Sequence, residues 1–275
     1  MNNLIFNVPL INGKNNSTLT DIAKLANKKY RSKDKLFICD GIKLFKEAME
    51  FGAVIKFIVL DNSVNFEDEV VACIKKCQEN GTKILCVEKS IFSKLTSENA
   101  PQGIISVCEY FNKKHRFSTL VENDQISGKK TIILESVRDP GNMGTILRNA
   151  AALGIDVIIL SSDCADIYSS KVVRSSMGAI FKLDIYVVDD LLTTVKNIKK
   201  SGRRVLAAAI DNRALILGKD EISSNDVVVL GNEGHGISDD LLSSCTNTLF
   251  IPMKENTESL NVAMASAIIM WEISK

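Results

Sequence analysis

The chain has 275 residues, of which 45% are hydrophobic and 24% charged, and its formal net charge is +1. This composition is typical of a soluble globular protein with one large or two medium domains, and it provides no overall basic field that would indicate a nucleic-acid partner. The N-terminus lacks the features of a signal peptide, and no apolar stretch is long enough to span a bilayer. The seven cysteines include no C-x-x-C pair and have no histidine pair nearby. We therefore expect a cytoplasmic protein with reduced cysteines and no bound metal.

The first part of the chain alternates helix-like and strand-like segments, which predicts a small α/β domain over residues 1–112. Helices are expected near 17–30, 41–52 and 66–79, and strands at 36–40, 55–61, 83–88 and 103–111. Charged residues, serine and glycine then interrupt the pattern, so residues 113–128 are predicted to be a linker.

A basic run lies within the first predicted domain. Residues 24–35 carry six basic residues and one acidic residue. Such a run is usually a solvated face, and the alternative is contact with a phosphate backbone. If the alternative holds, Lys28, Lys29 and Arg31 are the candidate RNA-binding residues.

The second part of the chain, residues 129–275, predicts a parallel sheet covered by helices on both faces. Apolar strands are expected at 131–135, 156–160, 184–188, 204–210, 226–230 and 249–253. In such sheets ligands bind beyond the carboxyl ends of the strands. Three loops at such ends carry unusual residues, at 135–144, 231–236 and 251–261.

The first loop leads into a predicted helix. Asn142 is expected to cap it, and Gly154 to follow its end. Arg148 lies one helical turn after Gly144 and leans back toward the positive end of the helix. This arrangement predicts an anion site suited to a phosphate of a nucleic acid, although Arg148 could equally be an ordinary surface arginine.

The second loop reads GNEGHG, in which the glycines do not follow the G-x-G-x-x-G order of dinucleotide-binding proteins. Glu233 would repel a pyrophosphate, and no phosphate-loop lysine is present, so this turn is not expected to hold phosphates. His235 is assigned no role. In the third loop, Ser259 and Asn261 flank Leu260, where they could be functional or simply cap the next helix.

Together these segments resemble the three motifs of the SpoU (TrmH) RNA ribose methyltransferases of the SPOUT superfamily. The matching stretches are N-x-G-x-x-x-R, then L-G-N-E-G-x-G, then I-P-M…S-L-N-V-A, and they occur in the order of the family. The first half is similar to the small, ribosomal-protein-like substrate-binding domain of that family, with Asp40 in place of the usual glutamate.

The resemblance implies a homodimer that uses S-adenosylmethionine, with a trefoil knot in the C-terminal domain. It implies methylation of a ribose 2′-hydroxyl in structured RNA, with 23S ribosomal RNA favoured over tRNA. The resemblance gives Arg148 the activation of the hydroxyl, either as a base or, as we prefer, as an electrostatic stabiliser. The other residues expected to orient the reaction are Asn142, Glu233, Ser259 and Asn261, and those expected around the cofactor are Ala208, Gly231, Ile251, Met253 and Leu260.

Three other functions are left open by the sequence. The chain could be a tRNA 2′-O-methyltransferase, or an RNA-binding ribosome-assembly factor that has no catalytic activity. A nicotinamide-dependent enzyme is disfavoured by the order of the glycines in the second loop.

Overall fold

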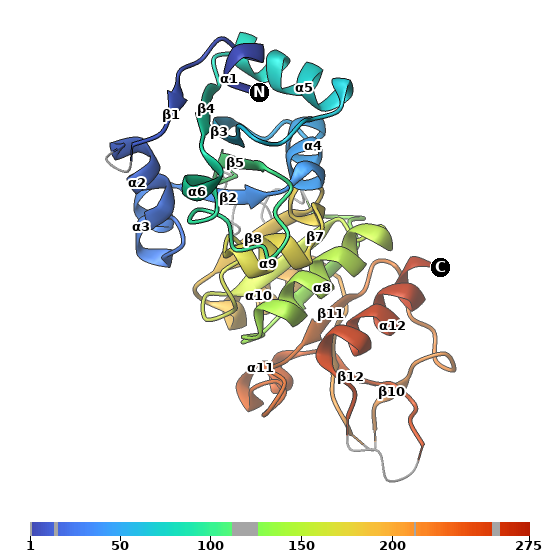
Figure 1. Cartoon of the computed structure of the whole chain (residues 1–275). Helices are drawn as coiled ribbons and strands as arrows, with labels where there is room; N and C mark the ends of the chain where they lie inside the picture. Colours follow the sequence, from blue (N-terminus) through green and yellow to red (C-terminus); the bar gives the residue numbers. More distant parts are fainter. Residues whose placement is uncertain (1, 14–15, 112–125, 212, 255–258) are drawn as a thin grey trace. The chain divides into compact units, whose positions relative to one another are not determined.

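The computed structural model describes residues 2–13, 16–111, 126–211, 213–254 and 259–275. The chain forms two compact units, each with its own sheet (Figure 1). We call residues 1–112 together with 166–181 the N-terminal unit, and residues 113–165 together with 182–275 the C-terminal unit. The predicted linker lies outside the described residues as far as residue 125, and Ile126 is buried in the core of the C-terminal unit.

The N-terminal unit contains a mixed five-stranded sheet in the order β1-β4-β3-β5-β2. β5 runs antiparallel to both of its neighbours, whereas β1, β4 and β3 pair in parallel. The strands are apolar because one face packs against α2, where Val59, Ile105 and Val107 are fully buried. The elements before the linker are α1 (Asn2–Ile5), β1 (Leu10–Ile11), α2 (Ser17–Lys24), α3 (Lys28–Asp34), β2 (Leu36–Asp40), α4 (Ile42–Glu50), β3 (Ile55–Asp61), α5 (Asp68–Glu79), β4 (Lys83–Val87), α6 (Lys89–Phe92) and β5 (Ile104–Glu109).

The single helix predicted near 17–30 is two helices, α2 and α3. The side chain of Asn27 accepts a hydrogen bond from the Lys29 amide at 2.9 Å and so begins α3 as an N-cap. At the end of α2, the Arg31 guanidinium donates to the carbonyls of Leu25 and Ala26 at 2.8 and 2.7 Å. The break is therefore stabilised from both sides by side-chain hydrogen bonds, which the pattern of apolar residues does not report.

Residues 166–181 pack with the N-terminal unit although they follow β7 in the chain. Tyr168 stacks on Tyr110 with ring centroids 3.7 Å apart, and its ring centroid lies 4.9 Å from that of Phe37. Asp166 forms an ion pair with Arg31 at 2.7 Å. Isolated aromatic residues so far apart in sequence carry no local pattern, so this packing has no signal in the sequence. The segment contains α9 (Ser170–Ser175) and a short 3-10 helix (Ala179–Phe181).

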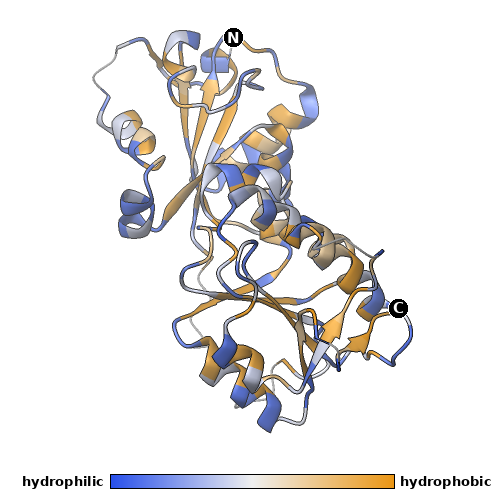
Figure 2. Ribbon diagram, turned by 90° about the horizontal axis from the view of Figure 1, so that it is seen from below, coloured by the Kyte–Doolittle hydropathy of each residue, from blue (hydrophilic) through white to orange (hydrophobic). Residues whose placement is uncertain are grey.

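The C-terminal unit has the predicted parallel sheet, with seven strands in the order β10-β12-β9-β11-β6-β7-β8. All of the neighbouring pairs run parallel. Figure 2 shows that the strands are mostly hydrophobic, whereas the helices carry both hydrophobic and hydrophilic residues. The elements are β6 (Thr131–Leu134), α8 (Pro140–Ala152), β7 (Val157–Ser161), β8 (Asp184–Val188), α10 (Leu191–Lys200), β9 (Val205–Ala208), β10 (Leu215–Ile216), β11 (Val227–Leu230), α11 (Asp239–Ser244), β12 (Asn247–Phe250) and α12 (Val262–Ser274).

The topology brings the three unusual loops together. β12, β9, β11 and β6 are consecutive neighbours in the sheet, so the segments that follow them leave from the same edge. The first loop leads from β6 into α8, and α12 packs beside α8 (Figure 1). Within the described part of the chain, no helix has both the length and the apolar character that crossing a bilayer requires.

Candidate active site

The start of α8 differs from the prediction in its capping residue. Asp139, not Asn142, is the N-cap, because its carboxylate accepts a hydrogen bond from the Asn142 amide at 2.8 Å. Pro140 follows at the first helical position, where its fixed backbone angle favours a helix and its missing N–H leaves no bond unmade. Because Asp139 takes the capping role, the side chain of Asn142 is left to contact the other loops.

Asn142 joins all three loops. Its side-chain amide donates to the Glu233 carboxylate at 3.0 Å, and its side-chain oxygen accepts from the Asn261 amide at 3.1 Å. Asn261 also caps α12, since its side-chain oxygen accepts from the Ala263 amide at 2.9 Å. Three predicted site residues from distant segments therefore form one chain of hydrogen bonds, Glu233–Asn142–Asn261. The capping prediction for Asn261 is confirmed, and its role in the reaction stays a prediction.

Glu233 lies against the start of α8. Partial burial acts to raise the pKa of this carboxyl, but the hydrogen bond from Asn142 and the backbone amides of Glu233, Asp139 and Arg138 outweigh it, so the pKa lies below its usual value. Two carboxylates of the protein, Asp139 and Glu233, therefore occupy the positive end of this helix. The protein's own acids already bond the amides of Arg138, Asp139 and Asn142, so the predicted phosphate site stays a prediction that rests on Arg148.

Arg148 lies exposed on α8, one turn after the buried Gly144. Its guanidinium has no hydrogen bond or ion pair with any of the described residues. The next residue, Asn149, donates to the carbonyl of Ala263 on α12 at 3.4 Å, which ties this part of α8 to the helix that follows the third loop. Arg148 is thus a cationic side chain on a fixed helix, with its donors available to a ligand.

The second loop has a backbone that only glycine allows at its first position. A Cβ atom on Gly231 would lie 2.3 Å from the carbonyl carbon of Gly236, which is too close for any side chain. Asn232 and Gly236 exchange two backbone hydrogen bonds, at 2.9 and 3.0 Å, and close the turn. The Asn232 side chain accepts from the Gly234 amide at 2.8 Å and donates to the Ser136 carbonyl at 2.7 Å. Asn232 is a structural anchor that the sequence analysis did not identify, although it lies inside the glycine motif.

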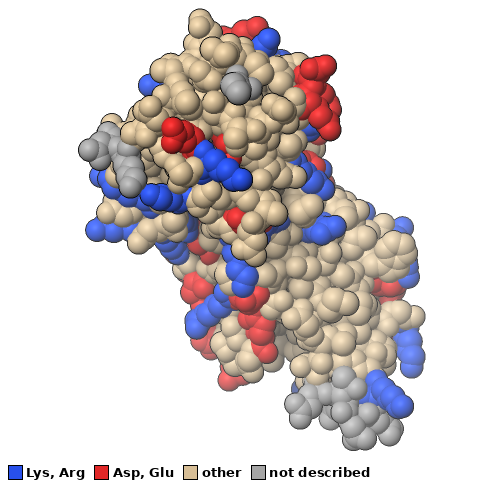
Figure 3. All heavy atoms as spheres, viewed as in Figure 1, with Lys and Arg blue, Asp and Glu red and all other residues tan. Residues whose placement is uncertain are grey.

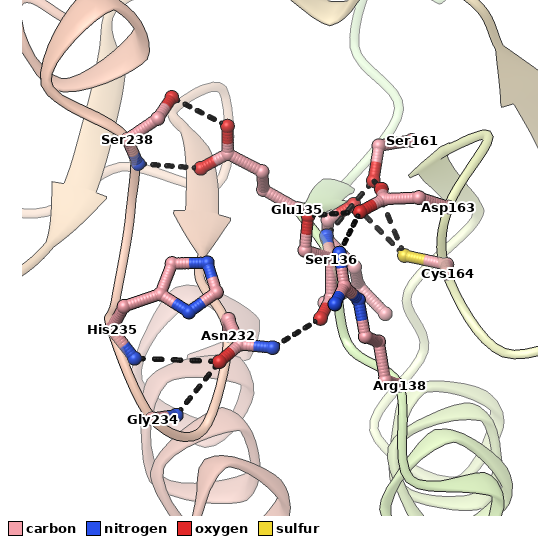
Figure 4. Close-up of polar contacts among 11 residues, drawn as sticks. Glu135, Ser136, Arg138, Ser161, Asp163, Cys164, Asn232, Gly234, His235 and Ser238 are labelled. Carbon is pink, nitrogen blue, oxygen red and sulfur yellow. Dashed lines mark hydrogen bonds and ion pairs between the residues drawn. The ribbon is translucent and has the colours of Figure 1, made fainter.

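A second set of contacts fixes the loop after β6 (Figure 4). The Glu135 carboxylate accepts from the amide and hydroxyl of Ser238, at 2.8 and 2.6 Å, and so joins β6 to the start of α11. Asp163 accepts from the hydroxyls of Ser136 and Ser161 at 2.6 and 2.7 Å, and from the Arg138 guanidinium at 2.9 Å. These contacts hold the pKa of Asp163 well below its usual range, the two hydroxyls contributing most. No pattern in the sequence predicts this set, because its members show no spacing typical of a site.

Four of the five predicted cofactor residues line one cavity of about 130 Å³. It lies at the ends of β9 and β12 and the start of α12, and its lining includes no charged side chain. Gly231 is not part of the lining. This volume is smaller than the roughly 300–1,000 Å³ of most ligand sites, so it would take only part of a nucleoside-sized ligand. The predicted residues in its lining are Ala208, Ile251, Met253 and Leu260, joined by Ser259.

The predicted RNA-binding residues behave in two different ways. Lys28 and Lys29 are exposed at the start of α3, in a region where Lys and Arg side chains gather (Figure 3). Arg31 is buried, with its side chain 6% exposed, and it binds Asp166 and two backbone carbonyls. The prediction that Arg31 contacts RNA is wrong, because all of its observed contacts are internal.

Among the described residues, no group of three or more potential metal ligands gathers at one place.

Comparisons with known proteins cover nearly the whole chain. Residues 129–271 match the SpoU rRNA Methylase family, and residues 16–106 match the MRM3-like substrate binding domain. The chain is 29% identical to the 23S rRNA (guanosine(2553)-2′-O)-methyltransferase RlmP of Bacillus subtilis, over 96% of this chain and 98% of that protein. It is 29% identical to the 23S rRNA (guanosine-2′-O-)-methyltransferase RlmB of Acinetobacter baylyi, over 70% of this chain and 78% of that protein. It also resembles the crystal structure of an AdoMet-bound rRNA methyltransferase from Sinorhizobium meliloti, with a TM-score of 0.82 and 28% identity over 96% of this chain and 97% of that one.

Proposed function

Because the chain belongs to the SpoU rRNA Methylase family, we propose that it transfers a methyl group from S-adenosylmethionine to the 2′-hydroxyl of a ribose in 23S ribosomal RNA. The observation that carries the proposal is the chain of hydrogen bonds between Asn142, Glu233 and Asn261. It forms at the start of α8, the helix that carries Arg148, which has no partner among the described residues. The activities of the relatives from Bacillus and Acinetobacter support the same reaction and the same class of RNA.

The cavity beside β9 and β12 fits part of S-adenosylmethionine. Its lining is apolar and uncharged, which suits an uncharged adenosine group better than a phosphate. The close approach of Gly231 to Gly236 leaves no room for a side chain at position 231, so the backbone there can come near a ligand. When bound, S-adenosylmethionine supplies an electrophilic methyl group on a sulfonium. Ala208, Ile251, Met253 and Leu260 would hold it, with Gly231 at the neighbouring turn.

Within this proposal, Arg148 binds the phosphate next to the reacting ribose and stabilises the charge that develops on its 2′-oxygen. Arginine is a poor general base because its pKa exceeds about 12. Glu233 is a weak base as well, because its pKa is lowered by Asn142 and by backbone amides. The Glu233–Asn142–Asn261 chain and Ser259 therefore act by orientation, and positioning of reactants alone can supply roughly 7–11 kcal/mol.

A second copy of the chain is the partner we propose for α12. Met264, Ile268 and Trp271 follow a helical spacing on α12 and are exposed, Trp271 to 59%, and Leu260 is exposed just before the helix. Leu260 also lines the cavity, so a second copy seated on these side chains would lie beside the cofactor site. We expect Trp271→Glu to convert a dimer to a monomer in sedimentation experiments. A monomeric wild-type protein at the same concentration would contradict the homodimer.

The test of the function is transfer of an isotopically labelled methyl group to purified 23S rRNA and, separately, to bulk tRNA. We expect label in the 23S rRNA, at a ribose 2′-oxygen located by primer extension. Label in tRNA alone would identify a tRNA methyltransferase instead. Calorimetric titrations with S-adenosylmethionine and with NAD give an independent result. We expect a heat of binding for S-adenosylmethionine and none for NAD. RNA binding without S-adenosylmethionine binding would identify a factor that binds RNA without catalysis.

A further inference from the structure

A groove in the N-terminal unit lies between α2, α3 and the sheet, with a volume of about 360 Å³. We call it the α2–α3 groove; its wall and floor include Ile22, Tyr30, Leu36 and Phe57, and its rim includes Lys24 and Lys33. The volume lies within the roughly 300–1,000 Å³ of small-ligand sites. No residue of the groove belongs to the site described above.

The groove offers aromatic faces to a ligand. Tyr30 and Phe57 are only partly buried, although Phe57 and Leu36 also pack on the core of the unit. The Lys24 ammonium lies 5.9 Å from the centre of the Tyr30 ring, and the Lys83 ammonium lies 6.0 Å from that of Phe57. A lysine can reach these faces because core side chains do not cover them fully. Each face is accessible from solvent, and a flat ring that stacks on it would displace the lysine ammonium that lies over it.

The rim itself carries Lys24 and Lys33 beside Asp21 and Asp34, and further lysines lie on the adjoining stretch of chain. Five lysines and two aspartates lie in the stretch 21–35, apart from the internal Arg31. One of the aspartates, Asp21, is bound to Lys24 at 2.8 Å. Lys28 and Lys29 are exposed at the start of α3, the helix that forms one wall of the groove. Aromatic faces bordered by free ammonium groups are the combination that binds single-stranded nucleic acid, through base stacking and phosphate contacts.

We propose that the α2–α3 groove binds one unpaired base of the RNA substrate, stacked on Tyr30 and Phe57, with Lys28, Lys29 and Lys33 on the flanking phosphates. Duplex RNA is recognised mainly by its shape and backbone, and does not need a concave aromatic site. The groove therefore selects a loop or a bulged nucleotide in the substrate. This inference rests on the proposed function, since it concerns how the same RNA is held.

The experiment compares variants of the full chain for binding to a fluorescent single-stranded RNA oligonucleotide and to the same strand in a duplex. We expect Tyr30→Leu to weaken binding of the single strand by about five- to a hundredfold, and to leave duplex binding unchanged. Tyr30→Phe keeps the ring and should bind as the wild type does. Phe51→Leu is a matched control, because Phe51 is 44% exposed in the same unit but does not line the groove.

Methyl transfer gives the second readout. With 23S rRNA we expect Tyr30→Leu to raise KM and to leave kcat unchanged, since the groove holds RNA and does not touch the reacting atoms. Wild-type affinity of Tyr30→Leu for the single strand, or equal losses for strand and duplex, would overturn the groove proposal. A wild-type protein that binds the oligonucleotide through Tyr30 but methylates no RNA would overturn the proposed function and leave the groove in place.

Discussion

The active site and the α2–α3 groove are built in different ways. In the active site, side chains from separate loops hydrogen-bond one another, as Asn142 does with Glu233 and Asn261. In the groove, the floor is apolar, the rim carries both lysines and aspartates, and exposed lysines of α3 lie nearby. Methyl transfer needs a fixed geometry, whereas holding a flexible RNA needs charge and a few stacking faces. We therefore expect single substitutions to act strongly and specifically in the first region, and weakly and additively on the rim of the second.

The largest effect should come from the one basic residue of the run 24–35 that is buried. Arg31→Ala leaves Asp166 without its ion-pair partner and leaves the carbonyls of Leu25 and Ala26 without a donor. We expect the free energy of unfolding in urea to fall by about 3–5 kcal/mol. Lys29→Ala, two residues away and exposed, is the control and should change stability by less than about 0.5 kcal/mol. Equal stability of both variants would contradict the internal role of Arg31.

The next effect concerns Arg148. Arg148→Ala should lower kcat for RNA methylation by about 10²–10³-fold, as expected when a group that stabilises developing charge is removed. The melting temperature should not change, because the side chain is exposed and has no bond to the described residues. Arg148→Lys retains the charge and should keep a measurable part of the rate. If the lysine variant is as inactive as the alanine variant, the fork-shaped guanidinium itself is required and the electrostatic role is insufficient.

Sequence reasoning succeeded where the signal is local and failed where it depends on partners distant in the chain. The strands are predictable because buried parallel strands read as apolar runs, and the site edge follows from the strand order. The bond between Asn142 and Glu233 joins residues 91 positions apart, so no local pattern reports that Glu233 occupies the start of α8. Arg31 likewise lies in the same local sequence pattern as its exposed neighbours. Its internal ion pair is with Asp166, which lies 135 positions later in the chain. The trefoil knot stays a prediction from the family resemblance.

Asn261 allows the cap of α12 to be separated from the active site. Asn261→Ser keeps a good N-cap but cannot bond Asn142, whereas Asn261→Ala loses both contacts. We expect Ala to cost about 1 kcal/mol in stability and Ser only a few tenths. Both should reduce kcat, by about tenfold, because the bond to Asn142 is lost in each. A serine variant with wild-type kcat would show that Asn261 is only a cap.

Lys28 and Lys29 test the rim of the groove. Each single change to alanine should weaken RNA binding modestly and equally for different RNA sequences, because a phosphate contact carries no sequence information. The slope of log affinity against log salt concentration should fall by about 1 for each lysine removed, and the double variant should add the two effects. Lys75→Ala on α5, outside the groove, is the control for general charge. An unchanged slope would remove these lysines from the RNA-binding surface.

The smallest effect should appear in the pH dependence of the free energy of unfolding. The residue responsible is Asp163, which holds the loop leading to Asn142 in place. The hydroxyls of Ser136 and Ser161, and then Arg138, lower its pKa in the folded state below the value of about 3.9 expected in the unfolded chain. The ionised carboxylate therefore stabilises the fold above about pH 4, and this contribution is lost as the pH falls through the folded-state pKa.

The difference in unfolding free energy between the wild type and Asp163→Asn should stay constant from about pH 7 to pH 5 and shrink below about pH 4. Asp239→Asn, at an exposed aspartate of the same unit, sets the baseline. A difference that grows on acidification would mean that Asp163 is stabilised in its protonated form, and that its contacts with Ser136 and Arg138 do not hold the loop through charge.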